Sequence, residues 1–497
     1  MTTATASIHS SIINLTKTIV GAGMLAIPFA FRNDGILVGI LLTLLAAITS
    51  GFGLFVLAKC SKTLINPRNS SFFQLTMIAF PNLSPLSDIS MIVQCFGVGL
   101  SYIVLIGDLF PTIFNNYGSR NFYILTSTIV IVPLCLLKRL DHLKYSSIVG
   151  LFALSYLSFL IVFVFIKDII LTNNLPPFER GSINWVSIYD FNGLLSTFTI
   201  IIFAYTGSMN LFTIINELNY NDIDSIKIVI NHSIAISTII FLIISIFGYL
   251  TFGTLTLGNI MLNYNYSNSL YIILGKLALG IMVILTFPLL FHPLRIACNN
   301  IIVWIILKYT GKKLHTTNVQ TPIILRIDDQ ENESLLNSTD SLEQFHQSTT
   351  KSSTHTSSPL QNSSTYGSFH NDIEPNLENH LTTVYSRVSQ ESLRDECPAL
   401  RFYTISAFLL ISMFSIALNI KSFALVLSLV GATGSTSISF ILPGLLGYIL
   451  IGRDKISRCE QLSTSDICYK RLSLVLMVFG ILVMFLSLYT TLVFDYN

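Results

Sequence analysis

Apolar residues fall into long runs along most of the chain, and short polar segments separate these runs. A run of about 18 or more apolar residues is long enough to cross a bilayer as a helix. Such runs lie near residues 11–31, 35–58, 88–112, 120–137, 146–167, 190–215, 228–252, 269–293, 401–419, 422–450 and 472–494. The pattern therefore predicts an all-α polytopic membrane protein with 11 transmembrane helices, eight in residues 11–308 and three in 401–494. The segment 292–308 could extend the eighth helix as an amphipathic stretch.

The first run is built poorly for a plain membrane anchor. Gly21, Gly23 and Pro28 interrupt it, and Lys17 lies inside it. Backbone groups freed in lipid cost several kcal/mol each unless something re-satisfies them, and a cation at a helix centre costs about 2.5–3.5 kcal/mol on insertion scales. A transport site needs both features, because bare backbone groups bind a polar solute and a charge couples to its movement. The alternative is a kinked helix whose glycines only allow close packing.

The sixth run carries a second interruption. Its middle reads Phe203-Ala-Tyr-Thr-Gly-Ser-Met-Asn-Leu211, which is polar and contains glycine. Spans one to five and six to ten would form two halves of opposite topology, because five is odd, and span eleven lies outside this repeat. Paired interrupted helices at matching positions of two halves are the best pointer in a sequence to a binding site at the membrane midplane.

The interrupted first span also indicates the chemical class of the solute that would bind there. Asn14, Lys17 and Gly21 follow the spacing i, i+3, i+7, so they share one face of a helix. Unwinding at 21–23 would expose N–H groups suited to a carboxylate and carbonyls suited to an ammonium group. A small zwitterion such as an amino acid matches both ends.

Composition supports the membrane assignment and excludes other classes. The chain is 52% hydrophobic and 11% charged, with a mean hydropathy of +0.67, whereas soluble domains carry about 25% charged residues. Its 7 cysteines are scattered without a CxxC pair, so neither a disulfide framework nor a metal site is supported. Nothing in the sequence supports nucleic-acid binding, an enzyme activity or a cofactor. The first ten residues hold no Lys or Arg, so we expect no signal peptide and a retained first span.

Lysine and arginine placement predicts the orientation. With residues 1–10 in the cytosol as a short tail, the short cytosolic loops hold 12 Lys and Arg residues and the opposite loops hold 5. The positive-inside rule favours this arrangement. It places the C-terminal tail, 495–497, on the far side of the membrane.

The loop 309–400 differs in kind from the other connections. It is rich in Ser, Thr and Asn and poor in apolar residues, so we expect it to be disordered and cytosolic. It is either a regulatory or sorting segment that kinases or sorting factors act on, or an inert tether. Composition does not decide between the two.

Three further features carry alternatives. Asp108 is either a deep charge that takes part in coupling or an interfacial residue before Pro111, and Thr286 is either a cation or proton ligand or a hydroxyl bonded to its own helix backbone. The small and hydroxylated run 430–439 in span ten indicates either a gating helix or a permanently packed core.

Several stretches resemble the amino acid/auxin permease family, and most of all its fungal vacuolar amino-acid transporters. They are residues 14–28, 136–147, 215–218 and 430–443. The resemblance covers all the predicted spans in order. It implies a LeuT-type 5+5 inverted repeat plus one helix, a cytosolic N-terminus and proton-linked amino-acid transport across the vacuolar membrane, with the lumen on the far side.

The resemblance also implies site residues. Substrate would contact the two unwound segments and their neighbours, namely Thr18, Gly21, Ala22, Gly23, Tyr205, Thr206, Gly207, Ser208 and Asn210. For ion coupling the resemblance points to Lys17 and Thr286, and Asp108 is a third candidate because of its deep charge alone. In sodium-coupled relatives an Asn and a span-eight Thr help to bind the cation; Thr286 matches that Thr, and Lys17 stands where the Asn would be. A fixed ammonium there argues against sodium coupling. Many relatives carry Cys-His-Gln before the Asn of span six, and this chain departs from them with Gly207-Ser208-Met209.

We expect a secondary active transporter that exports amino acids from an acidic lumen to the cytosol by proton symport and alternating access. An amino-acid sensor on the same scaffold, signalling through 309–400, is the alternative, and a passive channel is a third. The paired interrupted helices fit the first two and not a simple pore.

Overall fold

The computed structural model describes residues 6–64, 68, 70–80, 84–114, 117–137, 144–171, 178–186, 191–267, 269–310, 399–457 and 461–494. The chain divides into two compact units, Met1–Trp304 with Pro398–Asn497, and Ile305–Cys397. Most of the predicted loop 309–400 and the predicted tail 495–497 lie outside the described residues.

All regular elements in the described ranges are helical. They are α1 (Ile8–Ile19), η1 (Ala22–Ala26), α2 (Ile27–Asp34), α3 (Ile36–Ser61), α4 (Phe72–Ala79), α5 (Pro85–Ile113), α6 (Arg120–Cys135), α7 (Lys144–Phe165), η5 (Ile166–Leu171), α8 (Phe191–Ala204), α9 (Ser208–Glu217), α10 (Ile223–Phe252), η6 (Gly253–Leu255), α11 (Ile260–Asn263), η7 (Tyr264–Tyr266), α12 (Leu270–Thr310), α15 (Ala399–Asn419), α16 (Phe423–Val430), η8 (Gly431–Ser435), η9 (Ser437–Ile441), α17 (Leu442–Leu450), α18 (Arg453–Ser457) and α19 (Thr464–Phe494). The prediction of an all-α polytopic membrane protein is confirmed.

Helices cover every predicted span. Nine described helices are long and apolar enough to cross a membrane, and the bent pair made by α1 with η1 and α2 brings the number to ten. The segment predicted at 120–137 forms α6, which has 16 residues and is shorter than a typical span. The count of eleven therefore stays a prediction. The eighth helix does extend through 292–308, because α12 runs for 41 residues.

Local sequence signals set where the helices begin. Hydroxyl or carboxylate side chains accept a backbone N–H at the start of several of them: Ser7 for α1, Ser119 for α6, Asp222 for α10 and Ser422 for α16. The backbone N–H of Ser225 holds the pKa of Asp222 below its usual value. Gly35, at a φ of 75°, makes the turn between α2 and α3 that a residue with a side chain would adopt only with strain.

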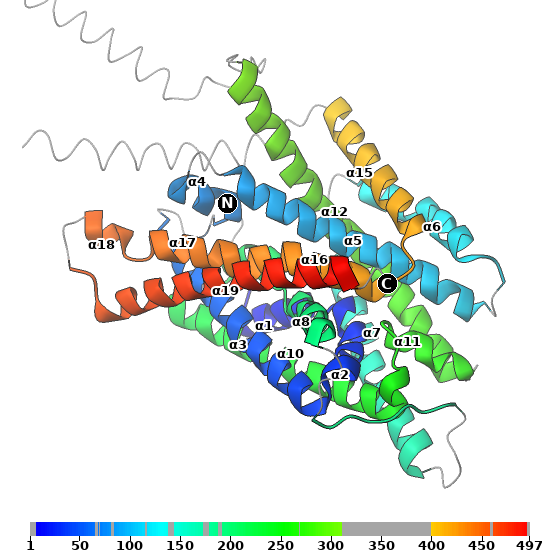
Figure 1. The fold of residues 1–497 in the computed structure, drawn as a ribbon. Helices are drawn as coiled ribbons and strands as arrows, with labels where there is room; N and C mark the ends of the chain where they lie inside the picture. Colours follow the sequence, from blue (N-terminus) through cyan, green and yellow to red (C-terminus); the bar gives the residue numbers. More distant parts are fainter. Residues whose placement is uncertain are drawn as a thin grey trace, which may run out of the picture. The chain divides into compact units, whose positions relative to one another are not determined.

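Helix contacts follow the two-fold pattern that a 5+5 inverted repeat requires. The repeat pairs α1–α2 with α8–α9, α3 with α10, and α7 with α16–α17. The contact of α7 with α10 has its counterpart in α17 with α3, and that of α1 with α7 has its counterpart in α8 with α16. In Figure 1, α17 and α19 lie side by side, and α17 contacts α3 while α19 contacts α8. The LeuT-type arrangement therefore agrees with the packing, and α19 lies outside the repeat.

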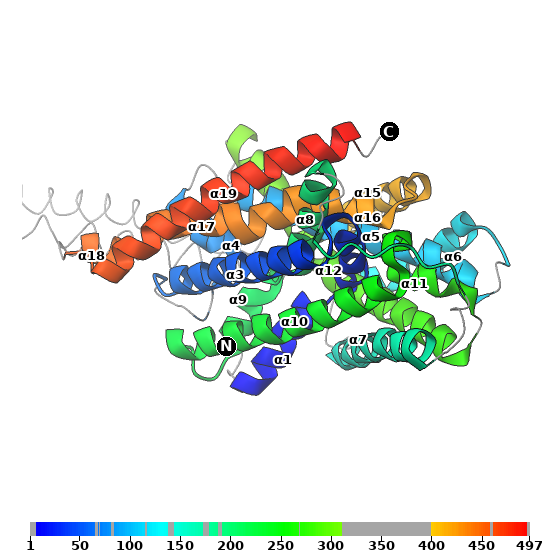
Figure 2. The ribbon, with the colours of Figure 1, turned by 60° about the horizontal axis from the view of Figure 1, so that its bottom comes forward.

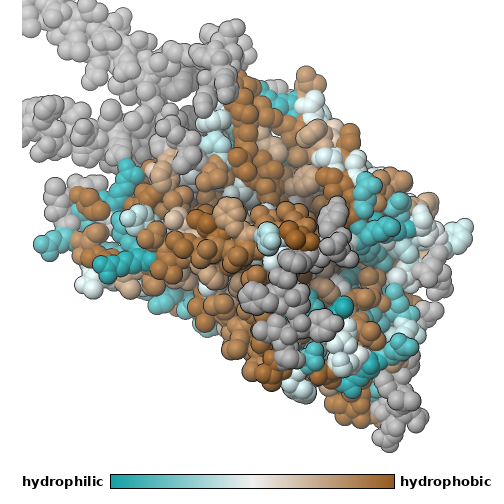
Figure 3. Space-filling view, viewed as in Figure 1, coloured by the Kyte–Doolittle hydropathy of each residue, from teal (hydrophilic) through white to brown (hydrophobic). Residues whose placement is uncertain are grey.

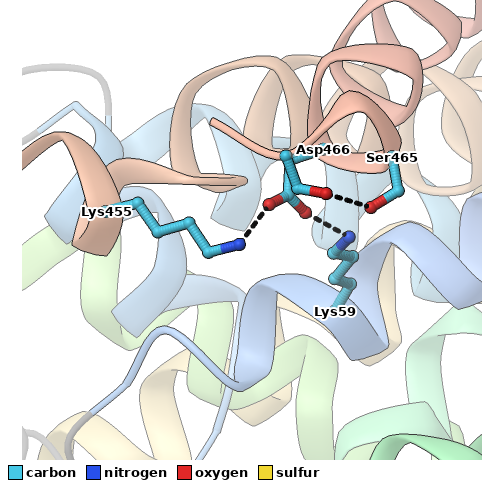
Figure 4. Close-up of polar contacts among 5 residues, drawn as sticks. Lys59, Lys455, Ser465 and Asp466 are labelled. Atoms are coloured by element: carbon cyan, nitrogen blue, oxygen red, sulfur yellow. Dashed lines mark hydrogen bonds and ion pairs between the residues drawn. The ribbon is translucent and has the colours of Figure 1, made fainter. Parts of the chain in front are cut away.

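The polar ends of the helices mark two opposite sides. Figure 2 shows the main helices running across the view, with α18 toward one end and the C-terminus toward the other. Figure 3 shows a band of hydrophobic side chains between hydrophilic groups at the two ends of the same face. At the α18 end, Asp466 binds Lys59 and Lys455 at 2.8 Å each, which joins α3, α18 and α19 (Figure 4). We call this end the N-terminal side, because α1 begins there.

Candidate functional site

The first span is broken where the sequence predicted it. α1 ends at Ile19, and η1 begins at Ala22 after a bend of 44° between the two halves of the span. Gly21 has an extended backbone, with φ −104° and ψ −162°, and its N–H donates to the carbonyl of Ile19 at 2.9 Å. The first N–H groups of η1 follow this break and have no preceding helical turn to accept them.

The sixth span is broken at the matching place. α8 ends at Ala204, three residues follow outside regular helix, and α9 begins at Ser208 with Gly207 as its N-cap. No side chain caps this end of α9. Both breaks therefore present the start of a helix in the middle of the bundle, where an anionic group is stabilised by the helix dipole.

The two breaks pack directly against one another. A Cβ on Gly23 would lie 3.0 Å from the ring of Phe203 and 3.2 Å from Cα of Ala204. A Cβ on Gly207 would lie 2.8 Å from the side chain of Ile19. Each break thus uses a glycine to let the other approach, and we call this arrangement the interlocked breaks.

Gly21 differs from these two glycines because a Cβ placed on it would meet its neighbour at an ordinary van der Waals distance. The nearest atom to a Cβ placed there would be the hydroxyl oxygen of Tyr102 on α5, at 3.9 Å. Tyr102 is 5% exposed. A tyrosine hydroxyl beside the break is a polar group that a solute bound there could contact. Tyr102 was not identified in the sequence analysis, because a single tyrosine in an apolar span cannot be distinguished from a residue that packs in the core.

A hydrogen bond joins the two broken spans on the N-terminal side of the breaks. Asn210 Nδ2 donates to Thr18 Oγ1 at 3.3 Å, and Thr18 Oγ1 donates to the carbonyl of Asn14 at 2.9 Å. Asn210 is exposed, and Thr18 is half-buried. These two predicted substrate residues are therefore brought together at an accessible position.

Accessibility differs on the two sides of the breaks. Lys17, Thr18 and Gly21 are half-buried, whereas the described residues of η1 and the run 196–208 are buried. The site is thus closed toward the end of α2 and more open toward the N-terminal side.

Three predicted residues of the second break have their side chains engaged or enclosed. Tyr205 is 0% exposed, and its hydroxyl donates to Thr238 on α10 at 2.8 Å. Thr206 donates to the carbonyl of Ile202 at 3.1 Å, and Ser208 is buried. Tyr205 and Thr206 can therefore contact a solute at the break only through their backbone. The same holds for Ala22 and Gly23 in the first span.

Lys17 extends from α1 to a place between α7 and α12. Its Nζ lies 3.8 Å, and its Cε 3.2 Å, from the position of a Cβ on Gly150 of α7. The side chain of Met282 on α12 lies 3.5 Å from the same position. Met282 also accepts, at its carbonyl, the hydroxyl of Thr286 at 2.7 Å, so Thr286 does bond to its own helix. Lys17 therefore lies near Met282, one helical turn before Thr286, and the role of both residues in ion coupling stays a prediction.

Asp108 lies elsewhere. Its Oδ1 is 3.0 Å from Arg120 Nε, and Arg120 also donates to the carbonyls of Ala417 and Ile420. This ion pair ties α5, α6 and the end of α15 together on the side opposite the N-terminus. Six residues separate Asp108 from Tyr102, which is about 9 Å along a helix. Its contacts match the interfacial alternative.

The connection after α9 is anchored on the N-terminal side. Ala6 pairs with Leu218 as an isolated parallel bridge, so the chain before α1 contacts the chain after α9. Lys62 donates to Asn221, and burial lowers the pKa of Lys62. Asn216 exchanges hydrogen bonds with Ser70. These polar contacts therefore hold the start of the first broken span and the end of the second together on the N-terminal side.

Comparisons with known proteins agree with this geometry. The family model described as "Transmembrane amino acid transporter protein" matches residues 4–486. The chain is 53% identical to vacuolar amino acid transporter 7 of Saccharomyces cerevisiae, over 98% of both chains, and 33% identical to vacuolar amino acid transporter 5 of the same yeast, over 97% of both. It is 36% identical to vacuolar amino acid transporter 5 of Schizosaccharomyces pombe, over 58% of this chain and 68% of that one.

A comparison of structures finds a slighter likeness. The crystal structure of a mutant manganese transporter from Eremococcus coleocola covers 97% of this chain and 95% of its own, with 11% identity and a TM-score of 0.37. A likeness of that degree locates no site. The family match and the two full-length yeast relatives carry the assignment, and they confirm the resemblance found in the sequence. The chain belongs to the transmembrane amino acid transporter family, in the branch that holds the fungal vacuolar transporters.

Proposed function

We propose that this protein is a secondary transporter of the vacuolar membrane that exports amino acids to the cytosol in symport with protons. The names of its yeast relatives support the substrate class and the membrane. The single observation that carries the proposal is the pair of interlocked breaks, in which Gly21 has room for a Cβ where Gly23 and Gly207 have none. Paired broken helices expose backbone groups to a solute while the rest of the fold stays helical.

The interlocked breaks suit a zwitterion. The substrate carboxylate would bind the N–H groups at the start of η1 and α9, where the helix dipoles favour an anion. Carbonyls at the end of α1 would accept hydrogen bonds from the substrate ammonium group. The Tyr102 hydroxyl, 3.9 Å from the Cβ position of Gly21, would contact the same solute. Substrate side chains would extend toward Thr18 and Asn210.

Lys17 takes the role that a bound cation has in sodium-coupled relatives. Its ammonium group lies between α1, α7 and α12. A fixed positive charge there repels Na⁺ and supplies its charge in the same region. We therefore assign coupling to protons and not to sodium, with Thr286 one helical turn after Met282, whose side chain lies near Lys17, and with Asp108 in a peripheral ion pair.

The placement of Lys and Arg residues predicts which end of the helix bundle faces the cytosol and which faces the lumen. With the N-terminal side in the cytosol, the closed end at α2 faces the lumen and the more open end faces the cytosol. The described conformation is then the one that releases substrate to the cytosol. Alternating access requires a second conformation in which α2 and α8 part toward the lumen.

A substrate panel tests the proposal. Vacuolar vesicles from cells with and without this chain are loaded with each amino acid, and exchange of labelled for unlabelled amino acid is measured. We expect chain-dependent exchange for a subset of amino acids and none for sugars. If no amino acid exchanges faster with the chain present, the protein is not an amino-acid transporter.

A further inference from the structure

The end of α2 holds a carboxyl group that the proposed transport cycle has not used. Asp34 is 0% exposed. Its Oδ1 lies 2.9 Å from Thr197 Oγ1 on α8, and its Oδ2 is buried with no hydrogen-bond partner. A buried ionised carboxylate with an unpaired oxygen is costly, so such a residue in a membrane protein marks a functional site.

The hydroxyl of Thr197 cannot serve all its neighbours at once. Thr197 Oγ1 lies 2.9 Å from Asp34 and also 2.8 Å from the carbonyl oxygen of Gly193. It has one hydrogen to donate. If Asp34 is neutral, its O–H donates to Thr197 and Thr197 donates to Gly193, so every hydrogen has an acceptor. If Asp34 is ionised, Thr197 must leave the carbonyl to reach one carboxylate oxygen, and the other stays unpaired.

No described cation compensates an ionised Asp34. On α2 itself, Arg32 donates to the carbonyl of Thr256 at 3.2 Å. α8 and η6 hold no charged residue, and α3 and α10 carry theirs near their N-terminal-side ends: Lys59 on α3, and Asp224, Lys227 and His232 on α10. In the segment 178–186, Glu179 is exposed and Arg180 donates to the carbonyl of Leu250.

The same segment closes over this end of the bundle. The N–H groups of Ile36 and Leu37 donate to the carbonyls of Asn184 and Trp185, at 3.1 and 2.9 Å. The N–H of Asn184 donates to the hydroxyl of Tyr249 on α10. Asp34 therefore lies at the α2–α8 contact on the side that faces the lumen in the proposed orientation, where those two helices must part for substrate to enter.

We propose that Asp34 is a proton-binding site of the lumenal gate, and that the gate closes when this carboxyl has taken up a proton from the lumen. The inference rests on the proposed function and names a residue for its proton dependence. In the open gate the carboxylate is hydrated and stable. A lumenal proton adds to it, no other bond changes, and the neutral group completes the Asp34–Thr197–Gly193 chain as α2 and α8 close. A basic lumen holds the gate open, and an acidic lumen favours closure and onward release to the cytosol.

The test compares Asp34→Asn with Asp88→Asn in vesicles whose lumenal pH is varied at a constant cytosolic pH. Asp88 is a second buried carboxyl, paired with Asn300 at the opposite end of the bundle, and serves as the matched control. One proton per closure allows wild-type efflux to rise by up to about tenfold per unit of lumenal acidification. We expect Asp34→Asn to lose this dependence, and Asp88→Asn and Thr197→Ser to keep it.

Two outcomes distinguish a wrong assignment of Asp34 from a failure of the proposed proton coupling. If wild-type efflux depends on lumenal pH and Asp34→Asn keeps that dependence, the Asp34 assignment is overturned while proton coupling stands. If wild-type efflux ignores lumenal pH, proton coupling fails together with the gate.

Carbodiimide labelling of the wild-type protein, mapped by peptide mass, provides a second measurement that needs no variant. We expect labelling at Asp34 to rise with lumenal acidification during turnover, and labelling there that ignores pH would also overturn the assignment.

Discussion

At the scale of single residues, two glycines that look alike in the sequence have different surroundings. Gly23 faces Phe203 and Ala204 at 3.0 to 3.2 Å, whereas a Cβ on Gly21 would have its nearest neighbour at 3.9 Å. The sequence could locate the break, because glycine and proline weaken a helix. It could not show which glycine is tightly packed and which has room for a side-chain atom, since that depends on α8 and α5. Tyr102 and Asp34 were missed for the same reason.

Gly21→Leu should abolish amino-acid binding without unfolding the protein. The larger side chain fills the space beside the Tyr102 hydroxyl, and nothing within 3.4 Å opposes its Cβ. Equilibrium binding of an exchanged amino acid, measured on purified protein, should be lost while thermal stability changes little. Gly23→Ala is the control, because its Cβ presses on Phe203 and should lower stability. Unchanged affinity in Gly21→Leu would show that substrate binds elsewhere.

Lys17→Met should reduce amino-acid flux by about tenfold or more, because about 1.4 kcal/mol of lost electrostatic stabilisation is a tenfold effect. Met keeps the length and apolar stem of Lys without its charge. Wild-type flux should be unchanged when Na⁺ is replaced by an impermeant organic cation. Flux that needs Na⁺, or a Lys17→Met variant with full activity, would contradict the assignment of Lys17 as a fixed charge in place of the cation.

At the scale of elements, the hydropathy pattern is sufficient to predict the long helices from the sequence, but it does not predict the short ones. Every predicted span is helical, but α4, α11 and the segment 178–186 are too short or too polar for a periodic signal. The small residues of span ten pack closely: a Cβ on Gly431 would lie 2.1 Å from the carbonyl oxygen of Thr199, and Ser435 donates to Gln94. The sequence could predict close packing there but not its partners, α8 and α5.

Gly431→Ala tests that packing. Alanine is favoured over glycine in a helix by about 1 kcal/mol, whereas overpacking a core costs about 1–3 kcal/mol. Because the new Cβ would collide with backbone of α8, we expect a net loss of thermal stability in detergent. Gly51→Ala is the matched control, since its Cβ meets only side-chain atoms of Ile234 at 3.6 Å or more. Equal melting temperatures for the two variants would contradict the close contact.

At the scale of the whole molecule, the repeat could be predicted because its two interrupted helices stand at matching positions. The closure of one end could not, because it depends on contacts between α2, α8 and residues 178–186. The orientation of the termini and the role of residues 309–400 stay predictions from charge and composition.

Deleting residues 311–398 separates the transporter from the sensor. The interlocked breaks lie wholly in the first unit, so amino-acid exchange in isolated vesicles should survive the deletion. Regulation by kinases or sorting factors, if this segment carries it, would change only delivery or activity in cells. Loss of exchange from correctly delivered, folded protein would favour the sensor or a segment that completes the site.

The central claim is that a proton gradient drives amino acids out of the vacuolar lumen through the interlocked breaks. The most direct measurement begins with one labelled amino acid at equal concentration on both sides of a vesicle membrane that carries this protein. An acid-inside gradient is then imposed, and net movement of label is followed with and without a protonophore. We predict net export that the protonophore abolishes and Gly21→Leu lacks. Exchange without net export under the gradient would contradict proton coupling.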